Sequence, residues 1–284
     1  MSDTITVFEV GPRDGLQSLG AHVATQTKIA LIDALTRAGL RKIEATSFVS
    51  PRWVPQMADA AAVMAGINRQ DGVTYAALTP NERGLDQALA AGCDEIAVFA
   101  SASEGFSRAN LNCSIEDSFA RFAPVMARSA QAGLPVRGYL STVIACPFDG
   151  PTPPSQVRHW AQRLLEIGCY EVSLGDTIGA GTPDTLADLL QTLLQDIPGT
   201  QLAGHFHDTS GRAGELVSCA LDLGLRTFDA SVAGLGGCPY APGAPGNIDT
   251  RKLLDLASAR GFTHGVDLSL LKEAERIASS ILGH

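Results

Sequence analysis

The stretch GHFHDTSG, residues 204–211, places two histidines one residue apart. On a β-strand, side chains two residues apart point to the same face. His205 and His207 can therefore face one side together while Phe206 packs on the other. Two imidazoles that converge in this way can bind one metal cation, or they can be hydrogen-bonded histidines of the core. The pair alone leaves both interpretations open.

A carboxylate and an amide can complete a metal site around these histidines. Asp14 lies in GPRDG, residues 11–15, directly after the first predicted strand, and Asn247 follows a glycine late in the chain. Each of the two can instead be a simple turn residue. Two imidazoles, a carboxylate and an amide oxygen, without any thiolate, suit a six-coordinate Mg²⁺ or Mn²⁺ better than tetrahedral structural zinc.

A thiol lies in a loop that can move. Cys238 occurs in GLGGCPYAPGAPGN, residues 234–247, which holds five glycines and three prolines. A loop of this composition can close over a site and carry the thiol to a reacting carbon. The same cysteine can also be a small buried hydrophobic residue. The glycines can in addition cradle a phosphate, as loops after late barrel strands often do.

The elements that must position these residues alternate along the chain. Amphipathic helical patterns such as residues 25–39 and 114–133 separate short β-branched runs, and the second opens with Ser114 and Asp117 as a loose capping box. The predicted strands are residues 4–10, 42–48, 73–79, 94–101, 136–144, 170–177, 201–208 and 227–234. Eight strands, each followed by a helix, predict one parallel sheet covered by helices.

The predicted fold is therefore α/β, a single (β/α)8 TIM barrel with extra C-terminal helix and loop elements. Its 284 residues form one catalytic domain, residues 1–284, with a flexible glycine-rich loop at 234–247. A barrel of this kind needs about 250 residues. No GxGxxG follows the first strand, which disfavours an open dinucleotide-binding sheet.

In such barrels the active site is built at the carboxyl ends of the strands. Polar residues lie at most of these predicted strand ends, which is typical of an active site and not of a core. They are Arg13, Asp14, Glu44, Ser47, Thr79, Ser103, Glu104, Arg137, Tyr139, Asp176, His205, His207 and Cys238.

Composition excludes several classes of function. The formal charge is −9 with no run of lysine or arginine, which argues against nucleic-acid binding. No apolar run approaches the roughly 20 residues of a membrane span, and the first residues do not form a signal peptide. The six cysteines are scattered and never form CxxC. We expect reduced thiols, no membrane partner and a cytoplasmic location.

Several motifs together carry a resemblance to a known family. VGPRDGLQ, SFVSPRWVPQMAD, NCSIEDSF, SLGDTIGAGTP, HFHDT and VAGLGGCPYAPGAPGN closely resemble the 3-hydroxy-3-methylglutaryl-CoA lyases, from Phe8 to about residue 270. RDG with HxH is shared by a wider group of metal-dependent barrel enzymes, whereas SFVSPRWVPQ and GGCPYAPG are more specific to the lyases. The resemblance implies retro-Claisen cleavage of 3-hydroxy-3-methylglutaryl-CoA to acetoacetate and acetyl-CoA, an acyl-CoA substrate, a divalent cation and a homodimer.

The resemblance also implies roles for individual residues. It implies a metal site made of Asp14, His205, His207 and Asn247. The catalytic candidates are Cys238, Arg13 at the thioester end of the substrate, Asp176 and Glu44, with Glu9 in support. The candidates for substrate binding are Arg13, Gln17, Tyr139, Arg137 and Thr177. Sequence leaves open whether Asp176 or a metal-linked carboxylate is the base, and whether Glu44 only supports Arg13.

Departures from the family leave the acyl group open. The first loop continues as LQSLG, not LQNEK, so Gly20 replaces a lysine common near the CoA, and Ser210 and Arg212 also differ from animal members. A longer 3-hydroxy-3-alkylglutaryl-CoA is one alternative substrate. Condensing relatives of the isopropylmalate or homocitrate synthase type are a second alternative, but they carry an extra C-terminal region and lack the GGCPYAPG loop. A non-catalytic metal-binding barrel is disfavoured by the reactive groups on the same rim.

Overall fold

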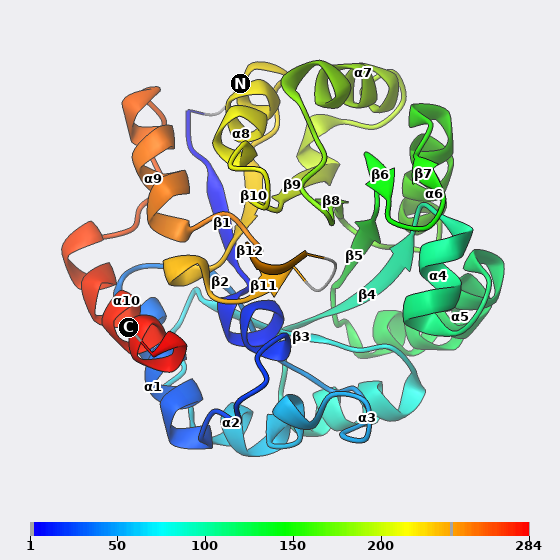
Figure 1. Ribbon diagram of the computed structural model, residues 1–284. Helices are drawn as coiled ribbons and strands as arrows, with labels where there is room; N and C mark the ends of the chain where they lie inside the picture. The colour runs from blue at the N-terminus through cyan, green and yellow to red at the C-terminus, as the bar shows by residue number, and fades with distance from the viewer. Residues whose placement is uncertain (1–2, 239–240, 284) are drawn as a thin grey trace.

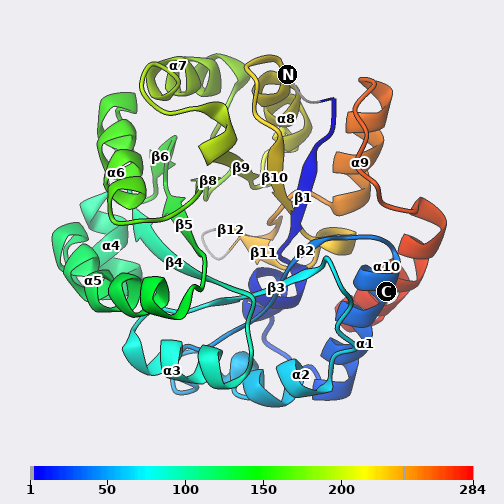
Figure 2. The same ribbon diagram turned by 180° about the vertical axis from the view of Figure 1, so that it is seen from behind.

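The computed structural model describes residues 3–238 and 241–283, and it describes the side chains of these residues except for 238 and 241–244. Eight parallel strands close into a barrel in the order β1-β10-β9-β8-β5-β4-β3-β2, as Figures 1 and 2 show from its two ends. The barrel strands are β1 Thr6–Glu9, β2 Lys42–Ser47, β3 Thr74–Leu78, β4 Glu95–Ser101, β5 Val136–Ser141, β8 Val172–Asp176, β9 Leu202–Phe206 and β10 Thr227–Ala230. The predicted (β/α)8 barrel is confirmed.

Helices form a ring outside the barrel (Figure 1). They are α1 Thr25–Arg37, α2 Ala60–Gly66, α3 Glu82–Ala90, α4 Glu104–Leu111, α5 Ile115–Ala132, α6 Pro154–Glu166, α7 Pro183–Leu193, α8 Ala213–Asp222, α9 Thr250–Ala259 and α10 Leu268–Leu282. Helix α10 packs against α1 and is the extra C-terminal element that the sequence predicted. Two helices, α4 and α5, follow β4, so the alternation is less strict than the sequence suggested.

Local sequence explains where these elements begin and end. Strand β8, VSLGD, is buried at every position, as expected for a parallel strand covered on both faces. Ser114 and Asp117 form the predicted capping box at the start of α5. The same helix ends at Gly133, whose φ of 66° lies in the left-handed region that glycine adopts without strain.

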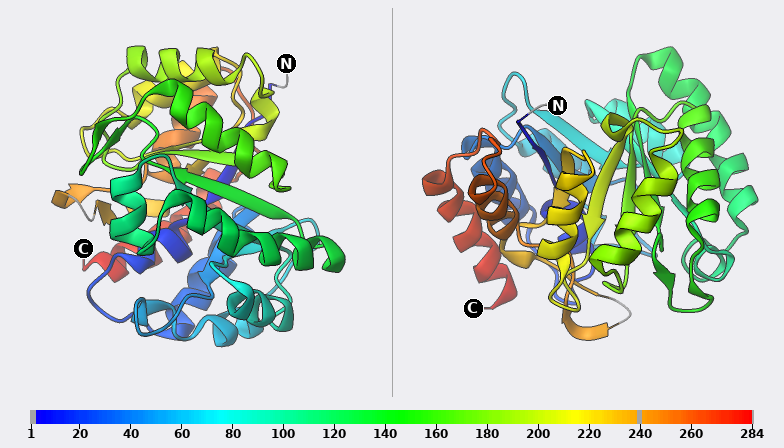
Figure 3. Two further views of the ribbon diagram at one scale, coloured as in Figure 1. Left: turned by 90° about the vertical axis from the view of Figure 1, so that its right-hand side faces the viewer. Right: turned by 90° about the horizontal axis from the view of Figure 1, so that it is seen from above.

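Two short hairpins and a turn of π-helix were not predicted. The hairpins are β6 Ala145–Cys146 with β7 Gly150–Pro151, and β11 Gly237–Cys238 with β12 Ala241–Pro245. Both project from the same end of the barrel (Figure 3). The π-helical turn, η1, spans Gly11–Gly15 and follows β1 directly. The barrel therefore carries its irregular structure where parallel strands deliver their carboxyl ends.

The structure also bears on the other sequence-based expectations. Among the described residues, no helix combines the length and apolar character needed to cross a membrane. The cysteines whose side chains are described, Cys93, Cys113, Cys146, Cys169 and Cys219, are free thiols.

Tight packing behind the histidines gives a testable prediction. A Cβ added at Gly204 on β9 would lie 2.7 Å from Phe206 Cε2, and Phe206 is itself buried. We expect Gly204→Ala to lower the free energy of unfolding by roughly 1–3 kcal/mol, because overpacking forces a buried ring to shift. Gly214→Ala in α8 is the matched control, since its new Cβ meets nothing closer than 3.5 Å. Urea unfolding of both variants checks this, and equal stability of the two would contradict it.

Candidate active site

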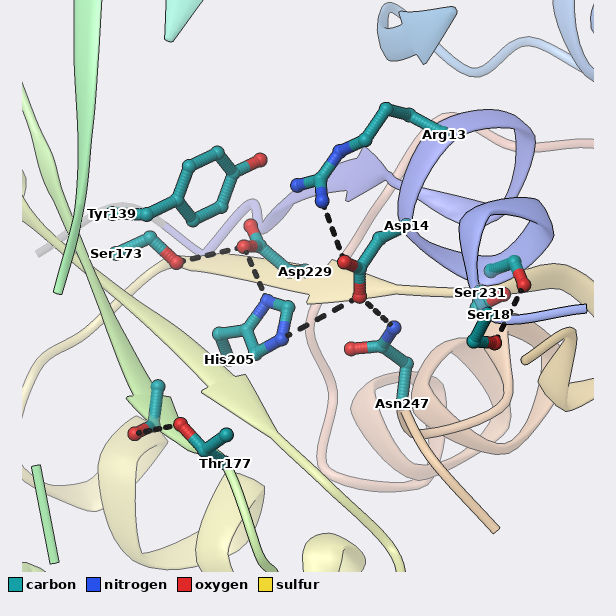
Figure 4. Close-up of polar contacts among 12 residues, drawn as sticks. Arg13, Asp14, Ser18, Tyr139, Ser173, Thr177, His205, Asp229, Ser231 and Asn247 are labelled. Carbon is teal, nitrogen blue, oxygen red and sulfur yellow. Dashed lines mark hydrogen bonds and ion pairs between the residues drawn. The ribbon is translucent and has the colours of Figure 1, made fainter. Parts of the chain in front are cut away.

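Side chains from opposite ends of the sequence converge at the carboxyl ends of the strands. One ligand atom each from Asp14, His205 and His207 lies within 4.8 Å of the others. Asp14 is in the turn η1 after β1, and the histidines are at the end of β9. Strand β10 alone lies between β1 and β9, so the carboxyl ends of these two strands are close together in the barrel. Figure 4 shows Asp14 pointing toward His205.

Asn247 joins this group from the loop before α9. A bridge pairs it with His207, and its Nδ2 donates to Asp14 Oδ2 at 2.6 Å. Two buried atoms in the group, Asn247 Oδ1 and His207 Nδ1, have no hydrogen-bond partner among the described residues. Buried polar atoms almost always have a partner. An amide oxygen and an imidazole nitrogen left this way fit a divalent cation that accepts mixed oxygen and nitrogen ligands.

The protonation states also suit a cation. Burial works against the charged form of Asp14, but Arg13 and His205 outweigh it and lower the pKa of Asp14 to about 2. Burial, with a smaller contribution from His205, lowers the pKa of His207 to about 4. At neutral pH the group therefore offers a carboxylate and a neutral imidazole, the forms that bind metal ions.

Arg13 lies beside the candidate metal site and is held by two carboxylates. Its Nε and Nη2 each lie 2.6 Å from Glu44 Oε2, and its Nη1 lies 2.6 Å from Asp14 Oδ1. Burial opposes the charge, yet Glu44 and Asp14 raise the pKa of Arg13 above its ordinary value. The Tyr139 hydroxyl donates to the same Glu44 oxygen at 3.1 Å. Arg13 is thus a permanent cation in a fixed orientation, and Glu44 is its direct partner.

The side chains of Asp176 and Thr177 accept hydrogen bonds from nearby backbone N–H groups. Each Asp176 carboxylate oxygen accepts one N–H, from Ala180 at 3.0 Å and from Gly181 at 2.8 Å. Burial raises the pKa of Asp176. The Thr177 hydroxyl accepts the N–H of Thr142 at 2.9 Å. Both residues lie at the carboxyl end of β8, where Asp176 orients the loop that follows β8 and Thr177 connects this strand end to the segment after β5.

Two other candidates for substrate binding have partners outside the group of Asp14, His205 and His207. Arg137 is fully buried inside the barrel and forms ion pairs with Glu171 and Asp229, both at 2.8 Å. Gln17 lines a cavity of about 520 Å³ together with His22 and other residues of the loops after β1 and β2. Contact of either residue with substrate stays a prediction.

The hairpin that carries Cys238 packs on the turn that carries Asp14. The side chain of Cys238 lies outside what the structure describes, but its backbone belongs to β11. Gly237 donates its N–H to Ser18 Oγ at 3.2 Å. A Cβ on Gly15 would lie 2.8 Å from the Leu235 carbonyl oxygen, so the two backbones approach as closely as glycine allows. The backbone that leads into β11 is therefore anchored next to the turn that contains Asp14.

Asp229 is the residue that sequence analysis missed. It is buried in β10, and its Oδ2 lies 2.9 Å from His205 Nδ1 (Figure 4). The sequence did contain a signal for it. In the strand TFDA, an acid stands between the apolar residues Phe228 and Ala230, and an acid buried in such a strand needs a partner.

The fold and this site define a class of protein, a (β/α)8 barrel with a candidate metal centre and a buried arginine at the carboxyl ends of its strands. The family model described as HMGL-like matches residues 4–278, and the chain belongs to this family.

Named relatives span nearly the whole chain. Hydroxymethylglutaryl-CoA lyase of Pseudomonas mevalonii is 53% identical over 279 residues, which are 98% of this chain and 93% of the relative. A Pseudomonas aeruginosa protein named 3-hydroxy-3-isohexenylglutaryl-CoA/hydroxy-methylglutaryl-CoA lyase is 50% identical over 98% of this chain and 93% of its own. The crystal structure of hydroxymethylglutaryl-CoA lyase from Pseudomonas aeruginosa superposes with a TM-score of 0.98 at 49% identity, covering 100% of this chain and 95% of that one.

Glu9 gives a prediction on pH dependence. Its carboxylate joins the turn η1 to the loop after β10, because Oε1 accepts the N–H of Gly11 and of Val232, each at 2.9 Å, and Oε2 accepts the Thr250 hydroxyl at 2.6 Å. Burial outweighs these bonds and raises the pKa of Glu9 from 4.5 to about 7. The fold therefore favours the protonated form, and this stabilisation is complete below pH 4.5 and is lost as the pH rises through 7.

We expect Glu9→Gln to remove this loss. The amide keeps an acceptor for both N–H groups, and its NH₂ can donate to the Thr250 hydroxyl. Between pH 5 and 8 the free energy of unfolding of the wild type should fall by roughly 3 kcal/mol more than that of the variant, since one pKa unit corresponds to about 1.4 kcal/mol. Urea unfolding across this range measures it, with Glu166→Gln on the exposed end of α6 as control. Parallel curves for Glu9→Gln and wild type would refute the assignment.

Proposed function

We propose that this protein cleaves 3-hydroxy-3-methylglutaryl-CoA to acetoacetate and acetyl-CoA with a divalent cation, Mg²⁺ or Mn²⁺, bound by Asp14, His205, His207 and Asn247. The observation that carries the proposal is the convergence of Asp14 and the two histidines within 4.8 Å, directly beside the buried guanidinium of Arg13. Membership of the HMGL-like family supports the same reaction, as does the 53% sequence identity to a hydroxymethylglutaryl-CoA lyase over 98% of this chain.

The reaction develops negative charge at two places. The tertiary hydroxyl loses its proton, and the C2–C3 bond then breaks so that its electrons form a thioester enolate. When bound, the cation lowers the pKa of the hydroxyl and orients it. Arg13 stabilises the charge that grows on the thioester oxygen. A fixed donor of this kind is worth about 3–4 kcal/mol in a closed site.

The supporting residues keep Arg13 in place. Glu44 receives two of its N–H groups, and Tyr139 donates to the same oxygen, so the guanidinium cannot rotate freely. Because the side chain is buried, its charge acts through a medium of low dielectric and not through water. We assign Arg13 to the substrate, and Glu44 and Tyr139 to holding it.

Asp176 is the candidate base for the hydroxyl proton. Each of its oxygens accepts only one N–H, which leaves a lone pair on each for a proton. Burial raises its pKa toward the range in which a general base works best near neutral pH. A carboxylate bound to the metal is the alternative acceptor.

Cys238 is the candidate acid that protonates the enolate carbon and so completes acetyl-CoA. The proposal relies on where the backbone lies, since β11 is anchored to Ser18 and to the turn that contains Arg13 and Asp14.

The substrate itself is the first test. Incubation of the purified protein with 3-hydroxy-3-methylglutaryl-CoA and Mg²⁺ or Mn²⁺ should release acetoacetate and acetyl-CoA in equal amounts, and EDTA should abolish the release. A panel of 3-hydroxy-3-alkylglutaryl-CoA compounds, including the isohexenyl compound, tests whether longer acyl groups are also cleaved. Condensation of acetyl-CoA with a keto acid and no cleavage would favour a condensing enzyme. Metal binding without either reaction would indicate a non-catalytic barrel.

The thiol is the second test. Cys238→Ala should lower kcat by at least about 100-fold, the usual size of a general acid contribution, with Mn²⁺ affinity unchanged. Cys93→Ala is the matched control. Cys93 is a buried thiol just before the amino end of β4, whereas the candidate site lies at the carboxyl ends of the strands, so its loss should affect stability only. Full turnover in Cys238→Ala would reduce the cysteine to a packing residue.

A homodimer, a cytoplasmic location and a place in leucine catabolism or ketone body formation are further parts of the proposed function. Gel filtration with light scattering tests the dimer directly.

A further inference from the structure

Asp229 lies at the centre of a buried hydrogen-bond cluster beneath the metal-binding group. Its side chain is 0% exposed, and β10 places it opposite His205 of β9 in the sheet register. Arg137 Nη2 donates to its Oδ1 at 2.8 Å, and Ser173 Oγ donates to its Oδ2 at 2.7 Å. The remaining contact of Oδ2 is with His205 Nδ1 at 2.9 Å. Figure 4 shows Asp229 between Ser173 and His205.

These contacts determine which ring nitrogen of His205 carries hydrogen. An ion pair with a buried arginine keeps the Asp229 carboxylate ionised, so the carboxylate has no hydrogen to donate. The hydrogen between Oδ2 and Nδ1 must then belong to the imidazole. In a neutral imidazole, hydrogen on Nδ1 leaves a lone pair on Nε2. His205 Nε2 is the atom that faces Asp14 Oδ2, at 4.0 Å.

We propose that Asp229 is a positioning residue that fixes the tautomer and the ring plane of His205, so that the Nε2 lone pair points at the cation. The inference rests on the proposed metal centre. A carboxylate behind a metal-binding histidine is a general device for orienting the ring and raising its basicity. Arg137 and Ser173 in turn orient the carboxylate, and Arg137 is shared with Glu171.

The two histidines differ in this respect. His207 Nδ1 is buried and has no hydrogen-bond partner among the described residues, whereas His205 Nδ1 is held by a carboxylate. Asp229 therefore acts on one ligand only. Its removal should weaken cation binding through His205 and leave Asp14, His207 and Asn247 where they are.

Asp229→Asn is the most informative variant, because it keeps the shape of the side chain and replaces one acceptor oxygen by an NH₂ donor. Arg137 can only donate, so the amide oxygen should stay at the position of Oδ1 and the NH₂ should replace Oδ2. That NH₂ then donates to His205 Nδ1 and favours hydrogen on Nε2, which blocks the ligand atom. We expect the Kd for Mn²⁺, measured from the free-ion EPR signal, to increase by about 10–100-fold.

Ser173→Ala is the matched control. It removes another hydrogen bond to the same Asp229 oxygen but does not alter the imidazole, so the Mn²⁺ Kd should change by less than about 3-fold. Circular dichroism and thermal unfolding establish that both variants fold. Equal Mn²⁺ affinity in Asp229→Asn and wild type, or equal loss in both variants, would overturn the inference.

A measurement on the metal-free wild type decides the question even where the variant fails to fold. ¹⁵N chemical shifts of the histidine rings, assigned with His205→Gln, should show His205 with hydrogen on Nδ1 and a bare Nε2. Hydrogen on Nε2 would refute the assignment. Failure of the wild type to bind Mn²⁺ would instead refute the proposed metal centre, so the two failures are distinguishable.

Discussion

Two buried arginines inside the barrel each lie between two carboxylates. Arg13 lies between Glu44 and Asp14 near the carboxyl ends of the strands, and Arg137 lies between Glu171 and Asp229 further inside. Taking an ion out of water costs several kcal/mol, and removing one partner leaves that cost uncompensated. The barrel can therefore keep these charges only with their partners in fixed positions. The ion pairs that the folded barrel needs for stability therefore also fix the positions of the side chains at the candidate site.

Tyr139 and His205 connect the two arginine clusters. The Tyr139 ring lies between the guanidinium groups, with its centroid 5.3 Å from Arg13 Cζ and 5.1 Å from Arg137 Cζ. His205 contacts the edge of the same ring and also lies between Asp229 and Asp14. A shift of either cluster would therefore change the position of the His205 imidazole, which would bind the cation. Tyr139, predicted from sequence to bind substrate, already has a structural task through its bond to Glu44.

Sequence predicts those features that depend on periodicity. The eight strands follow from β-branched runs, and the shared face of His205 and His207 follows from the two-residue period of a strand. The hairpins β6–β7 and β11–β12 escaped prediction because strands of two to five residues are too short to show a period, and all of them but β6 contain glycine or proline. The π-helical form of GPRDG also escaped prediction, since it depends on three of its four N–H groups, those of Arg13, Asp14 and Gly15, donating to one acceptor, the Val10 carbonyl.

Partners distant in sequence are the other part that sequence could not supply. Asp229 and Arg137 are 92 residues apart, and only closure of the barrel brings them to 2.8 Å. A lone acid in β10 predicts that some partner exists, but not which one. The placement of Asp176 shows the same limit. Its position at the end of β8 was predicted, whereas its two bonds to the backbone at Ala180 and Gly181 depend on the path of the following loop.

The contact between η1 and the β11–β12 hairpin shows how backbone packing can place two reactive groups together. Gly236 has a φ of 98°, and a Cβ there would lie 2.9 Å from Gly15 Cα. Because both residues are glycines, the two backbone segments can touch without side chains between them. Gly15 directly follows Asp14, and Gly236 is two residues before Cys238. One backbone contact therefore holds the turn that contains Asp14 against the segment that leads into β11, and a side chain added at either glycine would force the two segments apart.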